Sequence, residues 1–153
     1  ALDINTEALD LAKSAGADFT INATRGQHIE QLKEISSGGA HISIDALGNK
    51  QTCYDSVASL RKRGKHIQIG LLAGDDFEPA LPMQLVVANE LEIIGSHGMQ
   101  AHAYPEMLDM ITSGQLSPSN LLKERINLAE ACNALPHMNE FNSAGITLIN
   151  PFG

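Results

Sequence analysis

The sequence of 153 residues predicts an α/β protein built on a parallel β-sheet. Short apolar runs that are typical of strands alternate with helical patterns of about 10 to 15 residues. Glycine or proline stands at the end of most helical patterns, as expected where helices stop. The first apolar run ends in an acidic residue, Asp3, and a helix signal follows at once. Together these features favour βαβ units over an all-helical or an all-β fold.

The first third of the chain supplies two helices and two strands. Asn5 can cap a helix that runs to about Ala15, where Gly16 stops it. A strand is expected over Ala17–Asn22, and a second helix over residues 26–36 places Ile29, Leu32 and Ile35 on one side. The loop of residues 36–39, Ser-Ser-Gly-Gly, separates this helix from the next strand.

The middle of the chain repeats the alternation. His41–Ala46 predicts a strand, and Lys50–Arg63 predicts a helix with Cys53, Val57 and Leu60 facing inward. The elements expected after it are strands over 66–70, 91–95 and 145–149, and helices over 82–89, 105–114 and 128–135. The sequence contains no internal repeat and no low-complexity linker.

Charge and cysteine content narrow the function classes. The net charge is -8, and Arg61-Lys62-Arg63 is the main basic run, which we expect at a helix end rather than on a nucleic-acid-binding face. No apolar stretch reaches the roughly 20 residues that span a bilayer, so no membrane partner is expected. Cys53 and Cys132 lie on apolar helix faces, which predicts buried free thiols and a reducing, cytoplasmic setting.

Several segments, in order and at family-like spacing, resemble the cofactor-binding half of the medium-chain, zinc-type alcohol dehydrogenases. They are ALDINTEALDLAKSAGADFTIN, ISIDALGNKQTCYDSVASLRKRGKHIQIGLL, LEIIGSHGMQAHAYPEMLDMITSGQLSPSNLL and INLAEACNALPHM with AGITLINPF. The resemblance implies an incomplete Rossmann domain, a doubly wound parallel sheet lacking its first strand and glycine loop, over residues 1–143. It implies that residues 144–153 return to a catalytic domain outside this chain.

Asp3 is the strongest candidate site residue. A carboxylate at the end of the second Rossmann strand bonds the adenosine ribose hydroxyls and repels a 2′-phosphate, which favours NAD over NADP. The alternative is an acid that only stabilises a helix N-terminus. Other cofactor-binding candidates lie beside Asp3 or at later strand ends: Ile4, Ala46, Leu47, Gly48, Asn49, Ile69, Gly70, Leu71, Ser96, His97 and Gly98. Gly48, Gly70 and Gly95 could equally serve only as tight strand exits.

No residue of the chain is expected to be catalytic or to bind metal. His97 and His102, with Glu106, have loose spacing for a metal site, and His28, His41, His66 and His137 are expected at the surface or at strand ends. Asp45 is expected to bond neighbouring backbone or solvent. Thr147 stands where many zinc-type members place an arginine for the pyrophosphate, so a charge-assisted bond is missing there.

The resemblance implies an NAD-dependent alcohol dehydrogenase acting on a small alcohol or aldehyde, with zinc held outside this chain, which alone is expected to be inactive. A homo-oligomer is expected through the strand Leu91–Gly95. Two alternatives stay open, a zinc-free quinone reductase-like NADPH enzyme and a non-catalytic nucleotide-binding or assembly module. Without the central first strand, the second and fourth strands lose their shared neighbour, so we expect the isolated chain to fold poorly.

Overall fold

The structure is a computed structural model that describes residues 1–140 and 144–150. The chain divides into two compact units, which we name the middle unit, Gln27–Gly98, and the terminal unit, Ala1–Gly26 with Met99–Gly153. The boundary expected between residues 143 and 144 falls at the edge of the segment 141–143, which lies outside the described residues.

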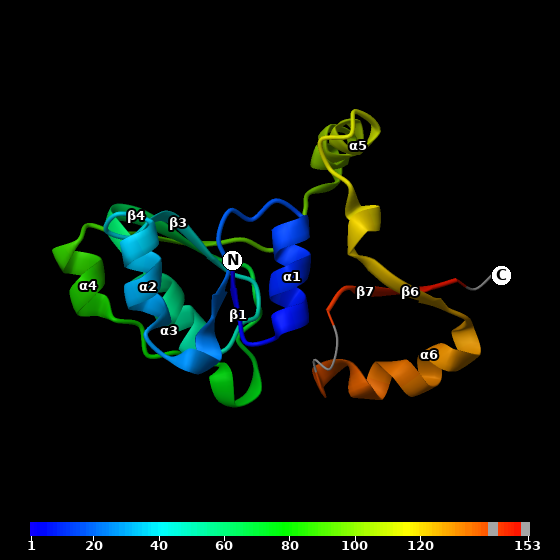
Figure 1. Cartoon of the computed structure of the whole chain (residues 1–153), viewed down its shortest axis with the longest axis horizontal. Coiled ribbons are helices and arrows are strands. Elements are labelled where there is room, and N and C mark those ends of the chain that lie inside the picture. Colours follow the sequence, from blue (N-terminus) through cyan, green and yellow to red (C-terminus); the bar gives the residue numbers. More distant parts are fainter. Residues whose placement is uncertain (141–143, 151–153) are drawn as a thin grey trace. The chain divides into compact units, whose positions relative to one another are not determined.

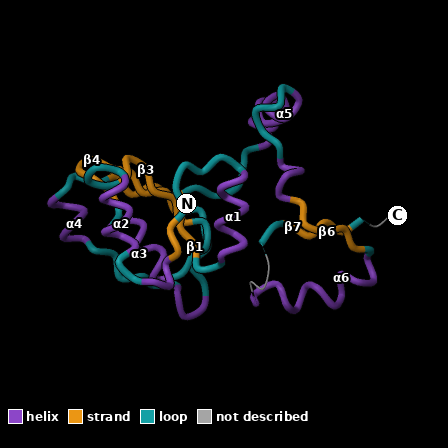
Figure 2. The backbone as a smooth tube through the Cα atoms, in the orientation of Figure 1, coloured by secondary structure: helices purple, strands orange, loops and turns teal. Residues whose placement is uncertain are grey.

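The middle unit has a three-stranded parallel sheet with strand order β3-β4-β5. Figure 1 labels β3 and β4 of this sheet and the helices α2, α3 and α4 of the same unit. Its elements are α2 (His28–Ile35), β3 (Ala40–Asp45), α3 (Lys50–Ala58), β4 (Leu60–Gln68), η2 (Gly74–Asp76), α4 (Met83–Ala88) and β5 (Glu92–Gly95). The strands alternate with helices, as the sequence predicts, because apolar runs bounded by caps and glycines alternate along the chain. Helix α3 packs against β3 and β4 (Figure 2).

The terminal unit has two separate two-stranded parallel pairs, β1 with β2 and β6 with β7. Its elements are β1 (Leu2–Asp3), α1 (Thr6–Ser14), β2 (Ile21–Asn22), η1 (Ala23–Arg25), η3 (Ala101–Ala103), α5 (Tyr104–Thr112), η4 (Pro118–Leu121), β6 (Leu122–Ile126), α6 (Leu128–Ala134), η5 (Leu135–Glu140) and β7 (Ile146–Ile149). Strand β6 is not among the strands expected from the sequence, and β2 is shorter than the expected Ala17–Asn22.

Two strands, one in each unit, have an edge without a strand partner among the described residues. Among the described residues, β1 pairs only with β2, and β3 pairs only with β4. Each of these strands therefore has one edge whose backbone N–H and C=O groups lack a neighbouring strand.

Helix α3 covers one face of the middle sheet. Its Cys53 and Val57 are only 2% and 1% exposed, and Leu60, the first residue of β4, is buried with them. Side chains alternate between the faces of a strand, so Ile42, Ile44 and Ile94 lie on the opposite face, where they are exposed. The inward placement of Cys53, Val57 and Leu60 is therefore confirmed.

The end of α3 was expected too late in the chain. The helix ends at Ala58 instead of Arg63, because the carbonyl of Ser59 already accepts the N–H of Ala40 at 3.0 Å and draws the chain into β4. Between Leu60 and Lys65 the register with β3 shifts, and Arg63 takes a left-handed φ of 61° within this bulge.

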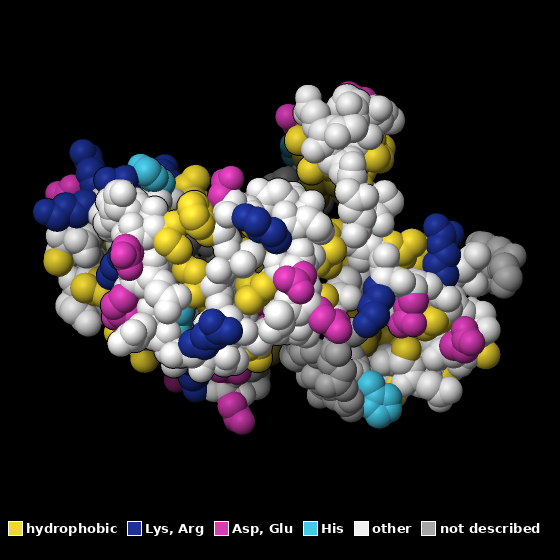
Figure 3. Space-filling view, viewed as in Figure 1, with side chains coloured by type: hydrophobic (Ala, Val, Ile, Leu, Met, Phe, Trp, Pro, Cys, Tyr) yellow, Lys and Arg dark blue, Asp and Glu magenta, His cyan; other side chains and the backbone are white. Residues whose placement is uncertain are grey.

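The basic run therefore lies on a bulged strand rather than at a helix end. Arg63 Nε lies 3.6 Å from a carboxylate oxygen of Glu90, and Lys65 Nζ lies 3.1 Å from one of Glu92. Figure 3 shows dark-blue and magenta side chains beside one another on this face of the molecule. Arg63 and the nearby Lys65 thus pair with acidic groups on the protein, and both pairs are exposed, so each contributes at most about 1 kcal/mol.

Two further expectations on burial were wrong. His66 is not a surface or strand-end residue but lies inside β4, 1% exposed. Cys132 is exposed, whereas Cys53 is buried, although both thiols are free. In α6, Ala131 is the buried residue, and the next position turns about 100° away around the helix axis.

Candidate functional site

The end of β1 leads directly into α1. An Oδ1 atom of Asp3 accepts the N–H of Asn5 at 2.8 Å, and the side chain of Asn5 in turn accepts the N–H of Glu7 at 2.8 Å as the N-cap of α1. Asp3 is exposed, and Ile4 beside it is 68% exposed. A short strand, an exposed carboxylate and a capped helix start thus follow one another directly along the chain.

In the middle unit, the ends of three parallel strands meet at one edge of the sheet. The register places Asp45 of β3 beside Gln68 of β4, and Gln68 beside Gly95 of β5. The sequence-predicted segments 46–49, 69–71 and 96–98 follow these three strand ends. The structure therefore brings these segments to one edge, where open α/β sheets bind their ligands.

Asp45 organises the turn after β3. Its side chain is buried, and Oδ1 accepts the backbone N–H of Leu47 at 2.9 Å, the N–H of Gly48 at 3.0 Å and the hydroxyl of Thr52 at 3.1 Å. Oδ2 accepts from Nε2 of Gln68 at 2.8 Å. The expectation that Asp45 bonds neighbouring backbone is confirmed, and its bond to β4 adds a contact between strands.

The pKa of Asp45 lies below its ordinary value. Burial acts to raise the pKa, but the hydrogen bonds from Gln68, from the two backbone N–H groups and from Thr52 favour the carboxylate and lower it further than burial raises it. The buried thiol of Cys53 has a raised pKa, first because of burial and second because of the negative charge of Asp45. This part of the site therefore holds one buried negative charge, satisfied by four donors.

Two glycines make close backbone contact at the strand ends. A Cβ on Gly70 would lie 2.3 Å from the backbone nitrogen of Gly48, and a Cβ on Gly48 would lie 2.5 Å from the carbonyl oxygen of Leu71. Gly48 also has a φ of 85°, a conformation that glycine adopts readily. Packing between the two turns is thus sufficient reason for both glycines, whereas Gly95 and Gly98 have open space where a Cβ would lie.

The same two turns present apolar side chains to the surface. Leu47, Ile69 and Leu71 are 50%, 48% and 74% exposed. Exposed leucine and isoleucine side chains at the carboxyl edge of a sheet can pack on the flat faces of a ligand ring. Asn49 is partly engaged, because its side-chain oxygen accepts the N–H of Thr52 at 2.8 Å as the N-cap of α3.

The segment after β5 remains open. Ser96, His97 and Gly98 are all exposed, and the N–H of Ser96 donates to the carbonyl of Gln68 at 2.9 Å. His97 and His102 belong to no group of three metal-ligating side chains within the part of the chain that the structure describes. In the terminal unit, Thr147 donates its hydroxyl to Glu124 at 2.9 Å.

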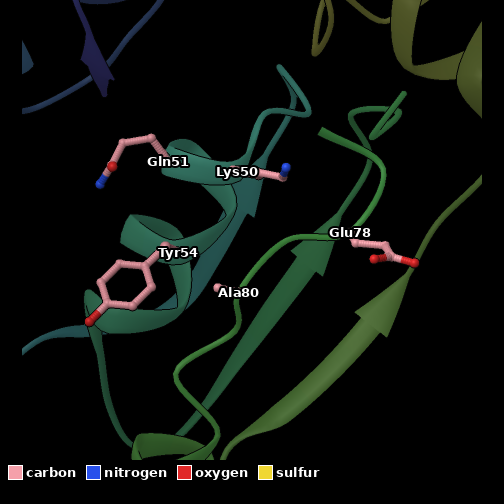
Figure 4. A pocket seen from close by; sticks show the side chains of 5 residues that line it. All are labelled: Lys50, Gln51, Tyr54, Glu78 and Ala80. Carbon is pink, nitrogen blue, oxygen red and sulfur yellow. The ribbon is translucent and has the colours of Figure 1, made fainter. Parts of the chain in front are cut away.

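A hollow of about 420 Å³ opens beside the start of α3. Lys50, Gln51 and Tyr54 of α3 line it together with Glu78 and Ala80 from the loop that follows η2 (Figure 4). Asp76 of η2 anchors this loop by accepting the N–H of Lys50 at 2.8 Å. None of the sequence-predicted site residues lines this hollow, so it is separate from the strand-end turns.

Sequence reasoning missed two polar residues at the site, His66 and Gln68. Both lie on the face of β4 that α3 covers, the same face as Asp45. The signal was present, because polar residues alternate with Ile67 and Ile69 along this strand.

No described helix is both long enough and apolar enough to cross a bilayer.

Comparison with known proteins agrees with this arrangement. A family model described as zinc-binding dehydrogenase matches residues 1–113. An NAD-dependent alcohol dehydrogenase of Sulfurisphaera tokodaii is 29% identical over 98% of this chain and 42% of its own length. The chain thus spans about two-fifths of the length of such relatives.

Solved structures share the fold. A benzyl alcohol dehydrogenase from Acinetobacter calcoaceticus superposes with a TM-score of 0.86 at 22% identity, covering 97% of this chain and 41% of that one. A short chain alcohol dehydrogenase from E. coli CFT073, complexed with cofactor NADH, gives a TM-score of 0.80 at 20% identity, covering 97% of this chain and 43% of that one. The fold, the order of the elements and the match over most of its length place this chain in the zinc-binding dehydrogenase family.

Proposed function

We propose that this chain is the NAD-binding part of an alcohol dehydrogenase. The observation that carries the proposal is Asp3, an exposed carboxylate at the end of β1 that leads directly into the capped helix α1. In dinucleotide-binding folds an acid at this position bonds the ribose hydroxyls. The similarity to NAD-dependent alcohol dehydrogenases supports the same function.

In this proposal the candidate residues contact different parts of the cofactor. Asp3 accepts hydrogen bonds from the adenosine ribose, and the exposed side chains of Ile4 and Leu47 suit the adenine ring. The nicotinamide riboside lies along Ile69, Gly70 and Leu71, and its carboxamide faces the backbone of Ser96–Gly98. The bound cofactor supplies hydride transfer, whereas the chain's own residues bind and orient it.

The chemistry on the alcohol belongs to the intact enzyme. We infer that zinc is held by residues outside this chain, that the substrate is a small alcohol or aldehyde, and that this chain alone is inactive. The two free thiols suit a reducing compartment such as the cytoplasm.

A homo-oligomer through β5 is part of the proposal. Strand β5 lies at the end of the middle sheet, all four of its residues are exposed, and Ile93 and Ile94 are 42% and 39% exposed. An apolar strand with an open edge can pair with the same strand of a second copy and continue the sheet.

Titration with NADH and NADPH tests the cofactor proposal. In the intact enzyme we expect Asp3→Asn to raise the Kd for NADH about tenfold or more, because charge-assisted hydrogen bonds contribute about 1.5–3 kcal/mol and about 1.4 kcal/mol is tenfold in Kd. Asp10→Asn is the matched control, since Asp10 is an exposed acid on α1. The Kd of this variant for NADH should stay within about twofold of that of the unmodified enzyme.

The discriminating result is the preference of the unmodified enzyme. Nicotinamide fluorescence should report tighter binding of NADH than of NADPH, and Asp3→Asn should narrow that difference because the charge that repels a 2′-phosphate is gone. Tighter binding of NADPH would favour the zinc-free quinone reductase-like alternative. Dimerisation without binding of either nucleotide would favour an assembly module.

A further inference from the structure

The buried carboxylate of Asp45 reaches several different parts of the middle unit. Two of its donors are backbone N–H groups of the turn after β3, one is Thr52 of α3, and one is Gln68 of β4. A carboxylate has about four acceptor positions, and this one accepts four hydrogen bonds, three at Oδ1 and one at Oδ2. None of these donors is a cation, which means that the charge is held by oriented dipoles alone.

Gln68 connects Asp45 to the turn after β4 by hydrogen bonds. Its Nε2 donates to Oδ2 of Asp45 and to the carbonyl oxygen of Gly70, both at 2.8 Å. Two acceptors around one amide nitrogen fix the orientation of the side-chain amide, so its Oε1 must be the atom 3.0 Å from Nε2 of His66.

The chain of hydrogen bonds then continues through His66 to Ser56 of α3. Because Gln68 Oε1 can only accept, Nε2 of His66 carries the hydrogen, and in the neutral imidazole Nδ1 accepts from the hydroxyl of Ser56 at 2.9 Å. His66 is 1% exposed, so water does not compete with this relay. In this chain of hydrogen bonds Ser56 therefore donates to His66, His66 donates to Gln68, and Gln68 donates to Asp45.

We propose that Asp45 is a positioning residue for cofactor binding. Through its own bonds it fixes the turn of Leu47 and Gly48, and through Gln68 it fixes the turn of Gly70 and Leu71. The two turns cross where a Cβ on Gly70 would lie 2.3 Å from Gly48 nitrogen, so neither can move without the other. This inference rests on the proposed function, since these turns carry the side chains that would contact the cofactor.

Asp45→Asn breaks the arrangement in either orientation of the new amide. If Nδ2 faces Gln68, two NH₂ groups meet, and if it faces the turn, it meets the N–H groups of Leu47 and Gly48. A buried donor that faces a donor loses its partner. In the intact enzyme we expect the Kd for NADH to rise at least about tenfold while the far-ultraviolet circular dichroism is unchanged.

Asp45→Asn combined with Gln68→Glu should restore much of the binding. The double variant keeps one buried charge, because the carboxylate introduced by Gln68→Glu accepts from the amide introduced by Asp45→Asn on one side and from His66 on the other. The bond to Gly70 is not restored, because a carboxylate oxygen then faces the Gly70 carbonyl oxygen, so the rescue is partial, and we expect the Kd for NADH to improve at least about threefold over the single variant. Asp55→Asn is the matched control, because Asp55 is a half-buried acid of the same unit, lies on α3, and is bonded to His28 at 2.9 Å and to Gln51 at 2.8 Å.

Amide hydrogen exchange gives a readout that does not depend on the cofactor. In Asp45→Asn the N–H groups of Leu47 and Gly48 should exchange at least about tenfold faster, while the N–H of Cys53, bonded within α3, should not change. Faster exchange with unchanged NADH binding would overturn the positioning role but leave the proposed function intact. An unmodified enzyme that binds neither nucleotide would overturn both, and a double variant no better than Asp45→Asn would overturn the relay through Gln68.

Discussion

Gly70→Ala tests how tightly the two strand-end turns cross. The new Cβ would lie 2.3 Å from Gly48 nitrogen and 2.5 Å from the carbonyl carbon of Leu47, whereas a real Cβ essentially never comes within 3.0 Å of such an atom. The turns must therefore separate by about 0.7 Å, the difference between 2.3 and 3.0 Å. Such a shift would stretch the 3.0 Å bond from Gly48 to Asp45 beyond the usual range of about 3.2 Å.

Since the obstacle is backbone on both sides, we expect the cost at the upper end of the usual overpacking range, roughly 3 kcal/mol of unfolding free energy. Urea unfolding of the intact enzyme without cofactor, followed by circular dichroism, measures it. Gly95→Ala is the control, because Gly95 also ends a strand but has nothing within 4 Å of its Cβ position, and it should change the stability by about 0.5 kcal/mol or less. Equal stabilities of the two variants would refute the crossing of the turns.

Three further outcomes follow from the structure. The pKa of Asp45 is lower in the folded protein than its unfolded value of about 3.9, so its carboxylate stabilises the fold above that value, and this stability is lost as the pH falls through the folded pKa. Urea unfolding at about pH 5 and pH 3 should therefore show a smaller decrease in the free energy of unfolding for Asp45→Asn than for the unmodified enzyme. Ile94→Lys should shift the intact enzyme to smaller species in sedimentation velocity, whereas Val87→Lys on α4 should not, and an unchanged oligomer in both would contradict pairing through β5. Residues 1–153 produced alone should unfold without a sharp transition, because β1 and β3 each keep an unpaired edge, and a cooperative transition by circular dichroism would contradict this.

The exposed isoleucines of the middle sheet bear on the last of these outcomes. Ile42 and Ile44 of β3 are 56% and 57% exposed on the face that α3 does not cover. Because these side chains are already partly buried, they forgo about half of the roughly 1.5–3 kcal/mol that full burial contributes for each. The middle unit therefore lacks apolar burial on one face as well as a neighbouring strand at one edge.

Elements that depend on near neighbours could be predicted from the order of residues alone. Asn5 caps α1, as expected, because a cap needs only a side chain and the N–H groups two or three residues later. Asn49 caps α3 in the same way, although it was expected only as a cofactor contact. The inward placement of Cys53 and Val57 follows from helical spacing in the same way. Leu60 was placed inward correctly although it belongs to a strand, because its apolar side chain suits burial in either structure.

Long-range contacts, in contrast, set where α3 ends and what holds the strand-end turns. The helix signal continues past Ala58, but β3 captures the carbonyl of Ser59 through the N–H of Ala40, which lies far back along the chain. Asp45 finds Gln68, and Gly48 meets Gly70, across a whole helix and strand of intervening sequence. Spacing along a sequence reveals which side chains share a face, whereas the partner that each polar group meets depends on which strands pair and in which register.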